Sequence, residues 1–375
     1  MSKLYNLAKL YFVAFIGILA ALLPYSLLAN ENYQTNVDYI IDTDIGGDID
    51  DVLALLVAIH SNHKPLAVTT THIEPKVKAK IAKLILTVNG YPDIPVYAGI
   101  GVTREVSEND FLKLNPLWPP NFGYPNPVEG HKKWYEKQAL AYQDAYGIQF
   151  ENLAIEKESA PDFIAKIAKN YSPQFPLIIV ALGPLHNIDF ALAKDDTIKN
   201  NILIYTMGGD YPKGYNWLIS PETTARVLDK IRTICISSEL IDNYDLKITP
   251  GEFNTIEKTT HTLLGKTIIA DWKNWLRIDQ KNPRATQLGD PVTMYLALHP
   301  EQIDSVISQK VQFPCLDKEG HLQSEFSGCW YSMPGLDNKI IVINENEESP
   351  VYFVKSVQSA QYLKDEIIAA IVKNE

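Results

Sequence analysis

Residues 39–56 read Tyr39-Ile40-Ile41-Asp42-Thr43-Asp44-Ile45-Gly46-Gly47-Asp48-Ile49-Asp50-Asp51-Val52-Leu53-Ala54-Leu55-Leu56. A short apolar run, typical of a buried strand, is followed by a glycine turn and by an apolar-periodic run that predicts a helix from about residue 51. Five of the ten residues from Asp42 to Asp51 are aspartates. Strand alternation places the first two on one face, and the other three follow in the turn and first helical turn. The sequence therefore predicts that several carboxylates converge on one point.

A group of carboxylates is costly to bury unless a cation lies among them. Carboxylate oxygens without Cys or His ligands favour Ca2+ or Mg2+ over zinc. The alternative is that Asp48 and Asp50 only cap the helix, since acids are favourable near its N-terminus. Capping accounts for one or two of the five aspartates and does not explain Asp42 and Asp44. The pattern therefore favours a metal site.

Predicted strands and helices alternate along the rest of the chain. The strands are expected at 66–70, 95–98, 176–182, 202–207 and 231–236, and the helices at 52–60, 76–89, 162–169, 187–193, 221–230 and 292–298. This alternation predicts an α/β fold, a single Rossmann-like domain with a mostly parallel central sheet flanked by helices. In such sheets ligands bind beyond the carboxyl ends of the strands. The aspartate-rich segment from Asp42 to Asp51, here called the acidic turn, and the turns at 183–184 and 208–210 fall at such ends.

Composition limits the classes of partner. The chain has 375 residues, of which 46% are hydrophobic, enough for a sizeable core. Its formal net charge is -11, and it contains no basic run that could neutralise phosphates. Binding to nucleic acid is therefore not expected, and a small uncharged substrate suits the surface better.

Residues 1–29 have the form of a secretory signal peptide. Lys3 and Lys9 precede an apolar run from Leu10 to Leu28, and the small residue Ala29 follows. We expect cleavage after Ala29, which would make the protein secreted or periplasmic, with residues 30–375 as the mature domain. The alternative is an uncleaved membrane anchor, because the run approaches the roughly 18 residues that a spanning helix needs.

Export changes how the cysteines are interpreted. In an oxidising compartment Cys315 and Cys329 could form a disulfide, leaving Cys235 as a buried thiol. An equally good interpretation is that all three are ordinary buried cysteines.

The segment from Asp42 to Asp51 resembles the aspartate-rich signature of the inosine-uridine preferring nucleoside hydrolases, the Ca2+-dependent N-ribohydrolases. That signature usually runs Asp-Thr-Asp-Pro-Gly-x-Asp-Asp, whereas this chain lacks the proline and is two residues longer before the final Asp pair. Later stretches match the same family in the same order, and they are Ala181-Leu182-Gly183-Pro184-Leu185-His186-Asn187-Ile188, Met207-Gly208-Gly209-Asp210 with Tyr215-Asn216 and Pro221-Glu222, and Gly289-Asp290-Pro291. The resemblance covers about residues 37–372 and implies a nucleoside hydrolase-like fold.

The resemblance also implies roles for individual residues. Asp44 would be the general base that delivers water to the anomeric carbon of a ribonucleoside, releasing ribose and the free base. The Ca2+ ligands would be Asp42, Asp44, Asp50, Asp51, Asp290 and the backbone carbonyl of His186. Contacts to the nucleoside would come from Asp48, His72, Met207 and Asn216. The longer turn leaves open how roles divide among Asp48, Asp50 and Asp51. Relatives are commonly oligomers, so a homo-oligomer is possible.

Residues 101–159 form a region rich in proline and aromatic residues. Helical periodicity is poor there, so we expect an insertion or lid beside the site. An aromatic flap could stack on a nucleobase, although aromatic residues beside prolines more often pack within a surface loop, which is the favoured interpretation.

Three departures from the family pattern motivate a second hypothesis. Gly289 stands where many relatives have a His that protonates the leaving base, Gly214 replaces a Glu, and His72 replaces an Asn. The chain could therefore be a homologue that binds a riboside with little or no turnover. A third hypothesis is a phosphatase, since Asp42-Thr43-Asp44 also resembles the haloacid-dehalogenase motif, but Ile45-Gly46-Gly47 does not continue that motif.

Overall fold

Strand β1 (Tyr39–Thr43) is buried along its whole length and lies inside the central sheet. The computed structural model of the chain describes residues 38–100, 127–208, 215–218, 220–276, 285–313, 318–319, 342–344 and 349–372. In this part of the chain β1 pairs in parallel with β2 (Ala67–Thr70) on one side and with β4 (Leu177–Ala181) on the other. Its position explains its apolar composition, because a strand covered on both faces has no solvent side.

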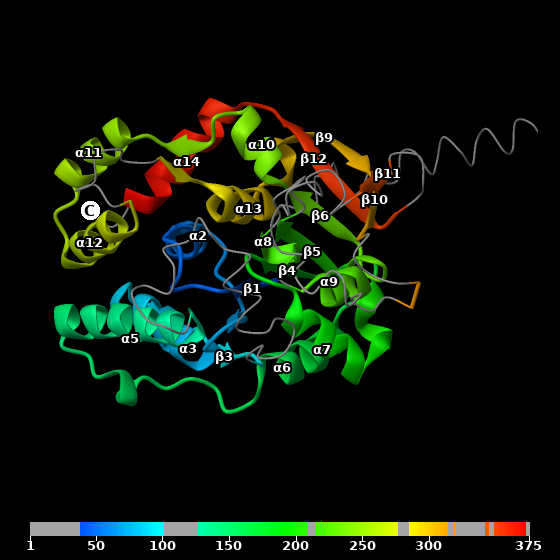
Figure 1. Cartoon of the computed structure of the whole chain (residues 1–375), viewed down its shortest axis with the longest axis horizontal. Helices are drawn as coiled ribbons and strands as arrows, with labels where there is room; N and C mark the ends of the chain where they lie inside the picture. The colour runs from blue at the N-terminus through cyan, green and yellow to red at the C-terminus, as the bar shows by residue number, and fades with distance from the viewer. Residues whose placement is uncertain are drawn as a thin grey trace, which may run out of the picture.

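The described strands form an eight-stranded sheet in the order β3-β2-β1-β4-β5-β6-β12-β9 (Figure 1). All neighbours are parallel except β12 and β9, which are antiparallel. The remaining strands of this sheet are β3 (Val96–Ala98), β5 (Ile202–Met207), β6 (Thr233–Ile236), β9 (Ile303–Ser308) and β12 (Val351–Val357). Two small antiparallel pairs join β7 (Lys247–Ile248) to β8 (Thr286–Gln287) and β10 (Lys310–Gln312) to β11 (Val342–Asn344). The predicted mostly parallel α/β sheet is confirmed.

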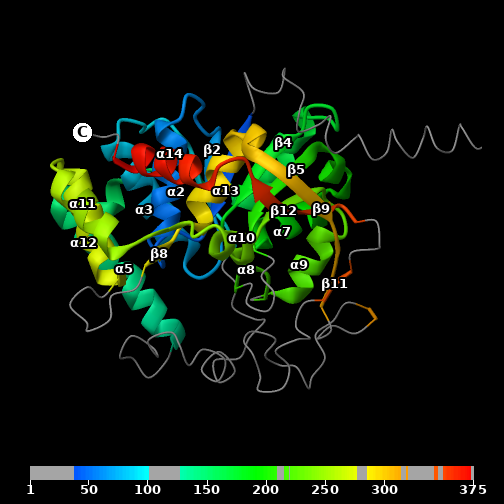
Figure 2. The same cartoon turned by 90° about the horizontal axis from the view of Figure 1, so that it is seen from above.

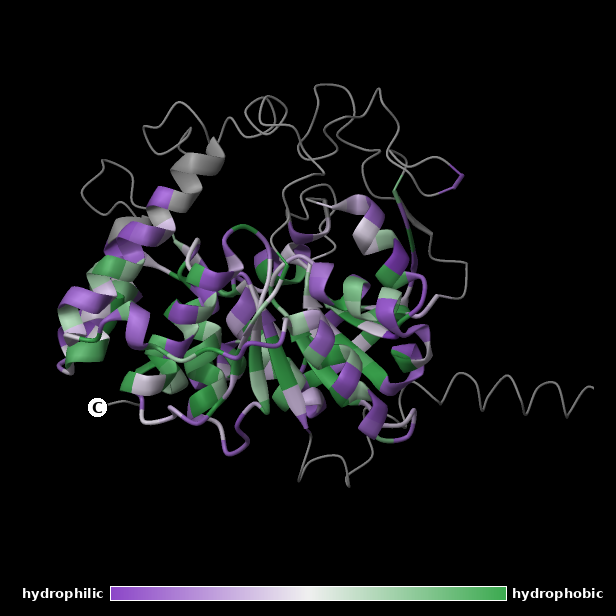
Figure 3. Cartoon of the chain, turned by 90° about the horizontal axis from the view of Figure 1, so that it is seen from below, coloured by the Kyte–Doolittle hydropathy of each residue, from purple (hydrophilic) through white to green (hydrophobic). Residues whose placement is uncertain are grey.

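Alternate residues of the strands enter two separate hydrophobic cores. Tyr39 and Ile41 belong to one core, and Ile40 belongs to the other. The first core receives α2 (Asp50–His60), α3 (Pro75–Val88), α10 (Ser238–Asn243), α11 (Pro250–Thr259), α12 (Leu263–Leu276), α13 (Gly289–Leu298) and α14 (Ala360–Val372). The second receives α6 (Ala160–Ile167), α7 (His186–Lys194) and α9 (Pro221–Leu228). Figure 3 shows mostly green strands between helices that mix green and purple. Helices on both faces thus bury the sheet.

The carboxyl ends of β1, β2, β4 and β5 open into the turns that carry the predicted site residues. α2 begins directly after the acidic turn, α7 after the turn at 183–184, and the short α8 (Tyr215–Leu218) follows β5. Helix α13 packs beside α2, although the two are far apart in the sequence (Figure 2). This packing brings residues from both ends of the chain to one edge of the sheet.

The second half of the proline- and aromatic-rich region is helical. Helix α5 (Pro127–Tyr146) packs against α3 and α12, and the short 3-10 helix Phe150–Asn152 follows. The poor periodicity did not predict this helix, because the buried stripe among its described side chains is narrow and consists of Tyr135, Ala139 and Tyr142. Residues 101–126, and therefore most of the prolines, lie outside the described residues.

The described helices include none with the length and apolar character to cross a membrane. The predicted signal peptide at 1–29 lies outside the described residues, as do Cys315 and Cys329. Cys235 is buried, as expected, and its thiol donates to the carbonyl of Gly208 at 3.1 Å.

Candidate functional site

Three carboxylates converge beyond the end of β1. Asp50 and Asp51 lie in the first turn of α2, and Asp290 lies in the first turn of α13. One oxygen of each lies within 4.8 Å of the others, a spacing at which one cation could contact all three. The sequence predicted that carboxylates from the 42–51 segment converge, and Asp290 was added by the resemblance to the family. The packing of α13 on α2 brings Asp290 close to Asp50 and Asp51.

The acidic turn is held by a chain of hydrogen bonds. The backbone N–H of Ile45 donates to Thr43 Oγ1 at 3.1 Å, and the Thr43 hydroxyl donates to Asp51 Oδ1. The end of β1 is thereby joined to the start of α2 across the glycine turn. The Asp51 carboxylate is oriented by the strand as well as by its own helix.

Asp42 is fully buried at the end of β1 and has only one satisfied carboxylate oxygen. Its Oδ1 accepts hydrogen bonds from Thr69 Oγ1 at 2.6 Å and from Asn187 Nδ2 at 2.7 Å. Its Oδ2 has no partner among the described residues. A buried oxygen in this condition is costly and is a typical ligand for a cation. Burial raises the pKa of Asp42 to about 7.

The other acids of the site also have raised pKa values. Burial is the largest cause for Asp44, Asp50, Asp51 and Asp290, and mutual repulsion adds to it for the last three. Two like charges in a desolvated site cannot both ionise cheaply. The arrangement therefore favours either protonation or a bound cation, and perturbed carboxyls of this kind are typical of functional sites.

Asp44 is partly exposed and lies against Gly183. A Cβ at residue 183 would lie 2.9 Å from both Cβ and Oδ1 of Asp44, and 2.8 Å from Cγ2 of Thr71. Only glycine fits here, so the Gly183-Pro184 turn allows the close approach of β4 to the predicted general base.

Two histidines predicted at the site are buried near it. His186 is the first residue of α7, and its backbone N–H donates to the carbonyl of Pro184 at 2.9 Å. His72 follows β2 with φ 69, a left-handed conformation that non-glycine residues rarely adopt. Such strained residues concentrate at functional sites, where the surrounding structure holds them in place.

The predicted substrate contacts lie around the ends of β4 and β5. The side-chain amide of Asn216 donates to the carbonyls of Leu182, at 2.6 Å, and Met207, at 3.2 Å. Its nitrogen therefore joins the two strand ends. Asp48 lies in the turn, where its Oδ1 accepts from the N–H of Ile49 at 2.6 Å. Residues 209, 210 and 214 lie outside the described residues.

Met207 fills the space beside Gly289. A Cβ at residue 289 would lie 2.7 Å from Cε and 3.0 Å from Sδ of Met207. The thioether therefore occupies the position into which a larger side chain at 289 would extend. The Met207 side chain thus lies where the His that many relatives have at this position would extend.

Lys78, Tyr135 and Asn187 contact the acidic residues, although their positions in the sequence predicted no such role. Asn187 lies within the 181–188 segment that resembles the family, and its amide donates to Asp42 Oδ1 and also to the carbonyl of Thr70 at 3.0 Å. Lys78 donates to the carbonyls of Asp44 and Ile45, and its ammonium lies 4.3 Å from the centre of the Tyr135 ring. Tyr135 belongs to α5, so the aromatic-rich region reaches the turn.

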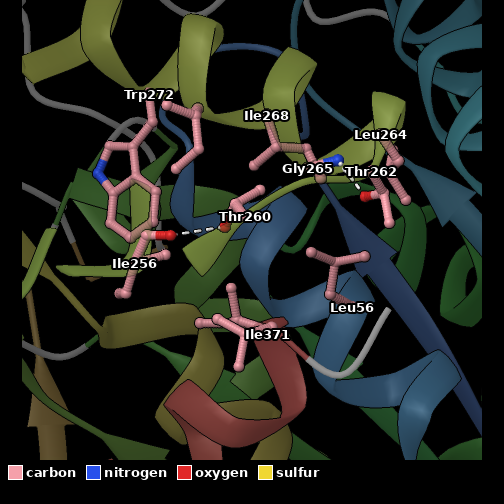
Figure 4. Close-up of a pocket in the computed structure, with 11 residues that line it drawn as sticks. Leu56, Ile256, Thr260, Thr262, Leu264, Gly265, Ile268, Trp272 and Ile371 are labelled. Atoms are coloured by element: carbon pink, nitrogen blue, oxygen red, sulfur yellow. Dashed lines mark hydrogen bonds between the residues drawn. The ribbon is translucent and has the colours of Figure 1, made fainter. Parts of the chain in front are cut away.

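A separate pocket lies between α11, α12 and α14 (Figure 4). Its lining residues are Leu56, Ile256, Thr260, Thr262, Leu264, Gly265, Ile268, Ile269, Trp272, Ile371 and Val372. The hydroxyl of Thr260 donates to the carbonyl of Ile256 at 2.7 Å, and Thr262 Oγ1 accepts from the N–H of Gly265 at 3.0 Å. None of the lining side chains is titratable, so the pocket offers no acid, base or metal ligand.

Comparisons with known proteins identify the family of the chain and relate its fold to solved structures. Residues 39–363 match the family described as inosine-uridine preferring nucleoside hydrolase. Among curated proteins none matches the chain significantly. A solved purine-preferring ribonucleoside hydrolase from Gardnerella vaginalis is similar over 90% of this chain and 98% of its own, with 18% identity and a TM-score of 0.62.

Two further solved structures have the same architecture. The plant nucleoside hydrolase PpNRh1 is similar over 90% of this chain and 99% of its own, with 18% identity and a TM-score of 0.61. An inosine-uridine preferring nucleoside hydrolase from Bacillus anthracis is similar over 90% of this chain and 100% of its own, with 16% identity and a TM-score of 0.61. At these identities the likeness establishes the fold alone.

Proposed function

Because this chain belongs to the inosine-uridine preferring nucleoside hydrolase family, we propose that it hydrolyses ribonucleosides to ribose and free base with Ca2+ held by its acidic turn. The family establishes the enzyme class, which is a hydrolase of N-glycosidic bonds. It also implies a small nucleoside substrate. The calcium ion, the residue roles and export are our proposals. The convergence of Asp50, Asp51 and Asp290 within 4.8 Å is the observation that carries the proposed site.

The residues at the turn fit a hard cation. The buried Oδ2 of Asp42 lacks a partner among the described residues. Burial disfavours the ionised forms of Asp42, Asp44, Asp50, Asp51 and Asp290. The side-chain donors are all carboxylate oxygens, and oxygen ligands without Cys or His side chains favour Ca2+ over zinc. We propose as ligands Asp42, Asp44, Asp50, Asp51, Asp290 and the backbone carbonyl of His186.

The bound cation would orient the ribose hydroxyls and lower the pKa of the attacking water. Asp44 is the proposed general base. Burial raises its pKa, which makes the carboxylate a stronger proton acceptor near neutral pH. Its neighbours Asp50, Asp51 and Asp290 would stabilise the positive charge that develops on the sugar as the N-glycosidic bond breaks.

Substrate contacts are proposed for residues that surround the turn. Met207, at the end of β5, and His72, after β2, would contact the nucleoside. Asp48 and Asn216 would add polar contacts, the latter through its amide oxygen because the nitrogen bonds two carbonyls. The thioether of Met207 beside Gly289 presents an apolar surface, which suits a flat base.

The experiment is ribose release by the purified chain with Ca2+ from inosine, uridine, adenosine, cytidine and nicotinamide riboside. We expect Asp44→Asn and EDTA treatment each to abolish turnover, and readdition of Ca2+ to restore the EDTA-treated enzyme. Asp304→Asn is the control, because Asp304 is an exposed residue of the edge strand β9. Turnover by Asp44→Asn equal to wild type would contradict the role of Asp44.

A ligand-binding homologue without turnover is the alternative that Gly289 motivates. Binding of Ca2+ and a riboside without ribose release would support it.

The proposed export is tested by measuring the mass of the mature protein, which should begin at Asn30 if the signal peptide is cleaved after Ala29.

A further inference from the structure

Lys78 is a fully buried lysine whose ammonium contacts the backbone of the acidic turn. It lies in α3 with 0% of its surface exposed. Its Nζ donates to the main-chain carbonyl of Asp44 and, at 3.2 Å, to that of Ile45. A buried ammonium is costly unless it is paired and hydrogen-bonded. The contacts to the turn compensate part of this cost, so the lysine and the turn are tied to one another.

The contacts of Lys78 complete the fixation of the backbone around Asp44. The N–H of Ile45 is already held by Thr43 Oγ1 at 3.1 Å. Lys78 holds the two carbonyls on either side of that N–H. Both polar groups of Ile45 and the carbonyl of Asp44 therefore have fixed partners, and two of these three bonds come from one side chain.

The face of α3 that carries Lys78 also fits the glycine turn. Ile81 lies one helical turn further along, on the same face. Gly46 has φ 109, and a Cβ there would lie 3.2 Å from Cδ1 of Ile81. The helix therefore supports the turn at two neighbouring points, through a charge at Lys78 and through packing at Ile81.

Tyr135 of α5 covers the ammonium. Its ring centre lies 4.3 Å from Lys78 Nζ, within the range of a cation–π contact. Tyr135 is only 3% exposed. Its ring atoms lie 3.5 Å from the Cβ position of Gly46 and 3.9 Å from that of Gly47. The ammonium is thus enclosed between the turn and an aromatic ring.

We propose that Lys78 is a positioning residue, whose buried ammonium holds the Asp44–Ile45 backbone so that the acidic turn keeps its cation-binding arrangement before a cation binds. The inference rests on the proposed function of the turn as a cation site. A positive charge near that site repels a cation, so charge alone predicts that removal of Lys78 tightens binding. Loss of positioning predicts the opposite, and the two effects can be distinguished by sign.

The test is calorimetric titration of Ca2+ into EDTA-stripped, dialysed protein. We expect Lys78→Met to weaken the Ca2+ Kd by about tenfold or more, the range found when groups that orient metal ligands are removed. The matched control is Lys83→Met. Lys83 lies on the same helix, and its Nζ also caps two carbonyls, those of Pro92 at 2.6 Å and Ile94 at 2.9 Å, away from the acids. Lys83→Met should lower the apo Tm and leave the Kd within about twofold of wild type.

Unchanged or tighter Ca2+ binding by folded Lys78→Met would overturn the proposal. Circular dichroism checks the fold, and Lys78→Gln, which keeps a polar donor, replaces Lys78→Met if that variant does not fold. Lys78→Gln should also bind Ca2+ more weakly, and wild-type affinity in it counts against the proposal equally. Failure of the wild type itself to bind Ca2+ would refute the proposed cation site, whereas normal wild-type binding with an unaltered variant would refute Lys78 alone.

Discussion

The side-chain amide of Asn187 donates to Asp42 Oδ1 at 2.7 Å, which joins the start of α7 to the end of β1 across 145 residues of sequence. The same nitrogen donates to the carbonyl of Thr70 at 3.0 Å. One amide therefore connects three neighbouring parts of the sheet's carboxyl edge. It also fixes the orientation of Asp42, so that the unpartnered oxygen is Oδ2.

Asn187→Leu should destabilise the protein by about 1–3 kcal/mol, because it removes one of the two hydrogen-bond donors to the buried Asp42 carboxylate and leaves only Thr69. Urea unfolding in EDTA measures this loss. Asn201→Leu is the matched control, since the amide of Asn201 makes one bond, to the carbonyl of Ala168 at 3.1 Å, far from the acids. Ribose release should fall in Asn187→Leu and stay at the wild-type level in Asn201→Leu. Equal activity of both variants would show that Asn187 does not support Asp42.

Gly183→Ala should reduce kcat/KM for ribose release by about tenfold to a hundredfold, because small displacements of a catalytic group are expensive. The added Cβ would lie 2.9 Å from Asp44 Oδ1, so the carboxylate must move. Gly251→Ala is the control, because its added Cβ would meet only Thr249 Oγ1, at 3.9 Å. It should keep full activity and gain slightly in Tm. Normal activity in Gly183→Ala would show that Asp44 needs no fixed position.

The acidic site was predictable where its parts are close in sequence or follow strands. Asp42, Asp44, Asp50 and Asp51 fall in one strand–turn–helix segment, and its periodicity identifies the edge of the sheet to which they belong. Asp290 was placed there by the resemblance of Gly289-Asp290-Pro291 to a family motif. The structure adds the reason, which is that α13 packs on α2.

The supporting residues could not be predicted, because their roles depend on tertiary packing. Lys78 is one of four lysines in α3, and nothing in the sequence marks it as the buried one with its charge turned inward. The role of Tyr135 could not be predicted for a similar reason, because the apolar pattern of α5 is weak. A signal does exist in the spacing of Tyr135, Ala139 and Tyr142, which places them on one helical face.

Asp271 should make the stability of the protein depend on pH. It lies in α12, and its carboxylate accepts hydrogen bonds from Gln138 Nε2 and the Tyr142 hydroxyl, both at 3.0 Å. Burial raises its pKa above the ordinary 3.8, although the two hydrogen bonds oppose the rise. The folded state therefore binds the proton more tightly than the unfolded state, and this group's contribution to stability falls as pH rises from 3.8 through the raised pKa.

Asp271→Asn removes this contribution. The free energy of unfolding is measured with urea, without metal, at a series of pH values. We expect the stability of the variant to rise relative to that of wild type as pH rises through that window. The difference between the two proteins isolates Asp271, because the acidic site titrates in both. Parallel curves would mean that its pKa is the same in the folded and unfolded protein.

The double variant Met207→Ala/Gly289→His should hydrolyse inosine faster than wild type, because an imidazole beside the base could protonate the base near neutral pH. Gly289→His alone should gain less, since its Cβ would lie 2.7 Å from Cε of Met207 and the thioether would have to shift. Truncation of Met207 makes the room. We expect the double variant to exceed both single variants by about tenfold or more on inosine. The control substrate is p-nitrophenyl riboside, whose leaving group departs without a proton and should gain little. An equal gain on both substrates would indicate better binding of the sugar, and no gain on inosine would show that residue 289 does not face the leaving base.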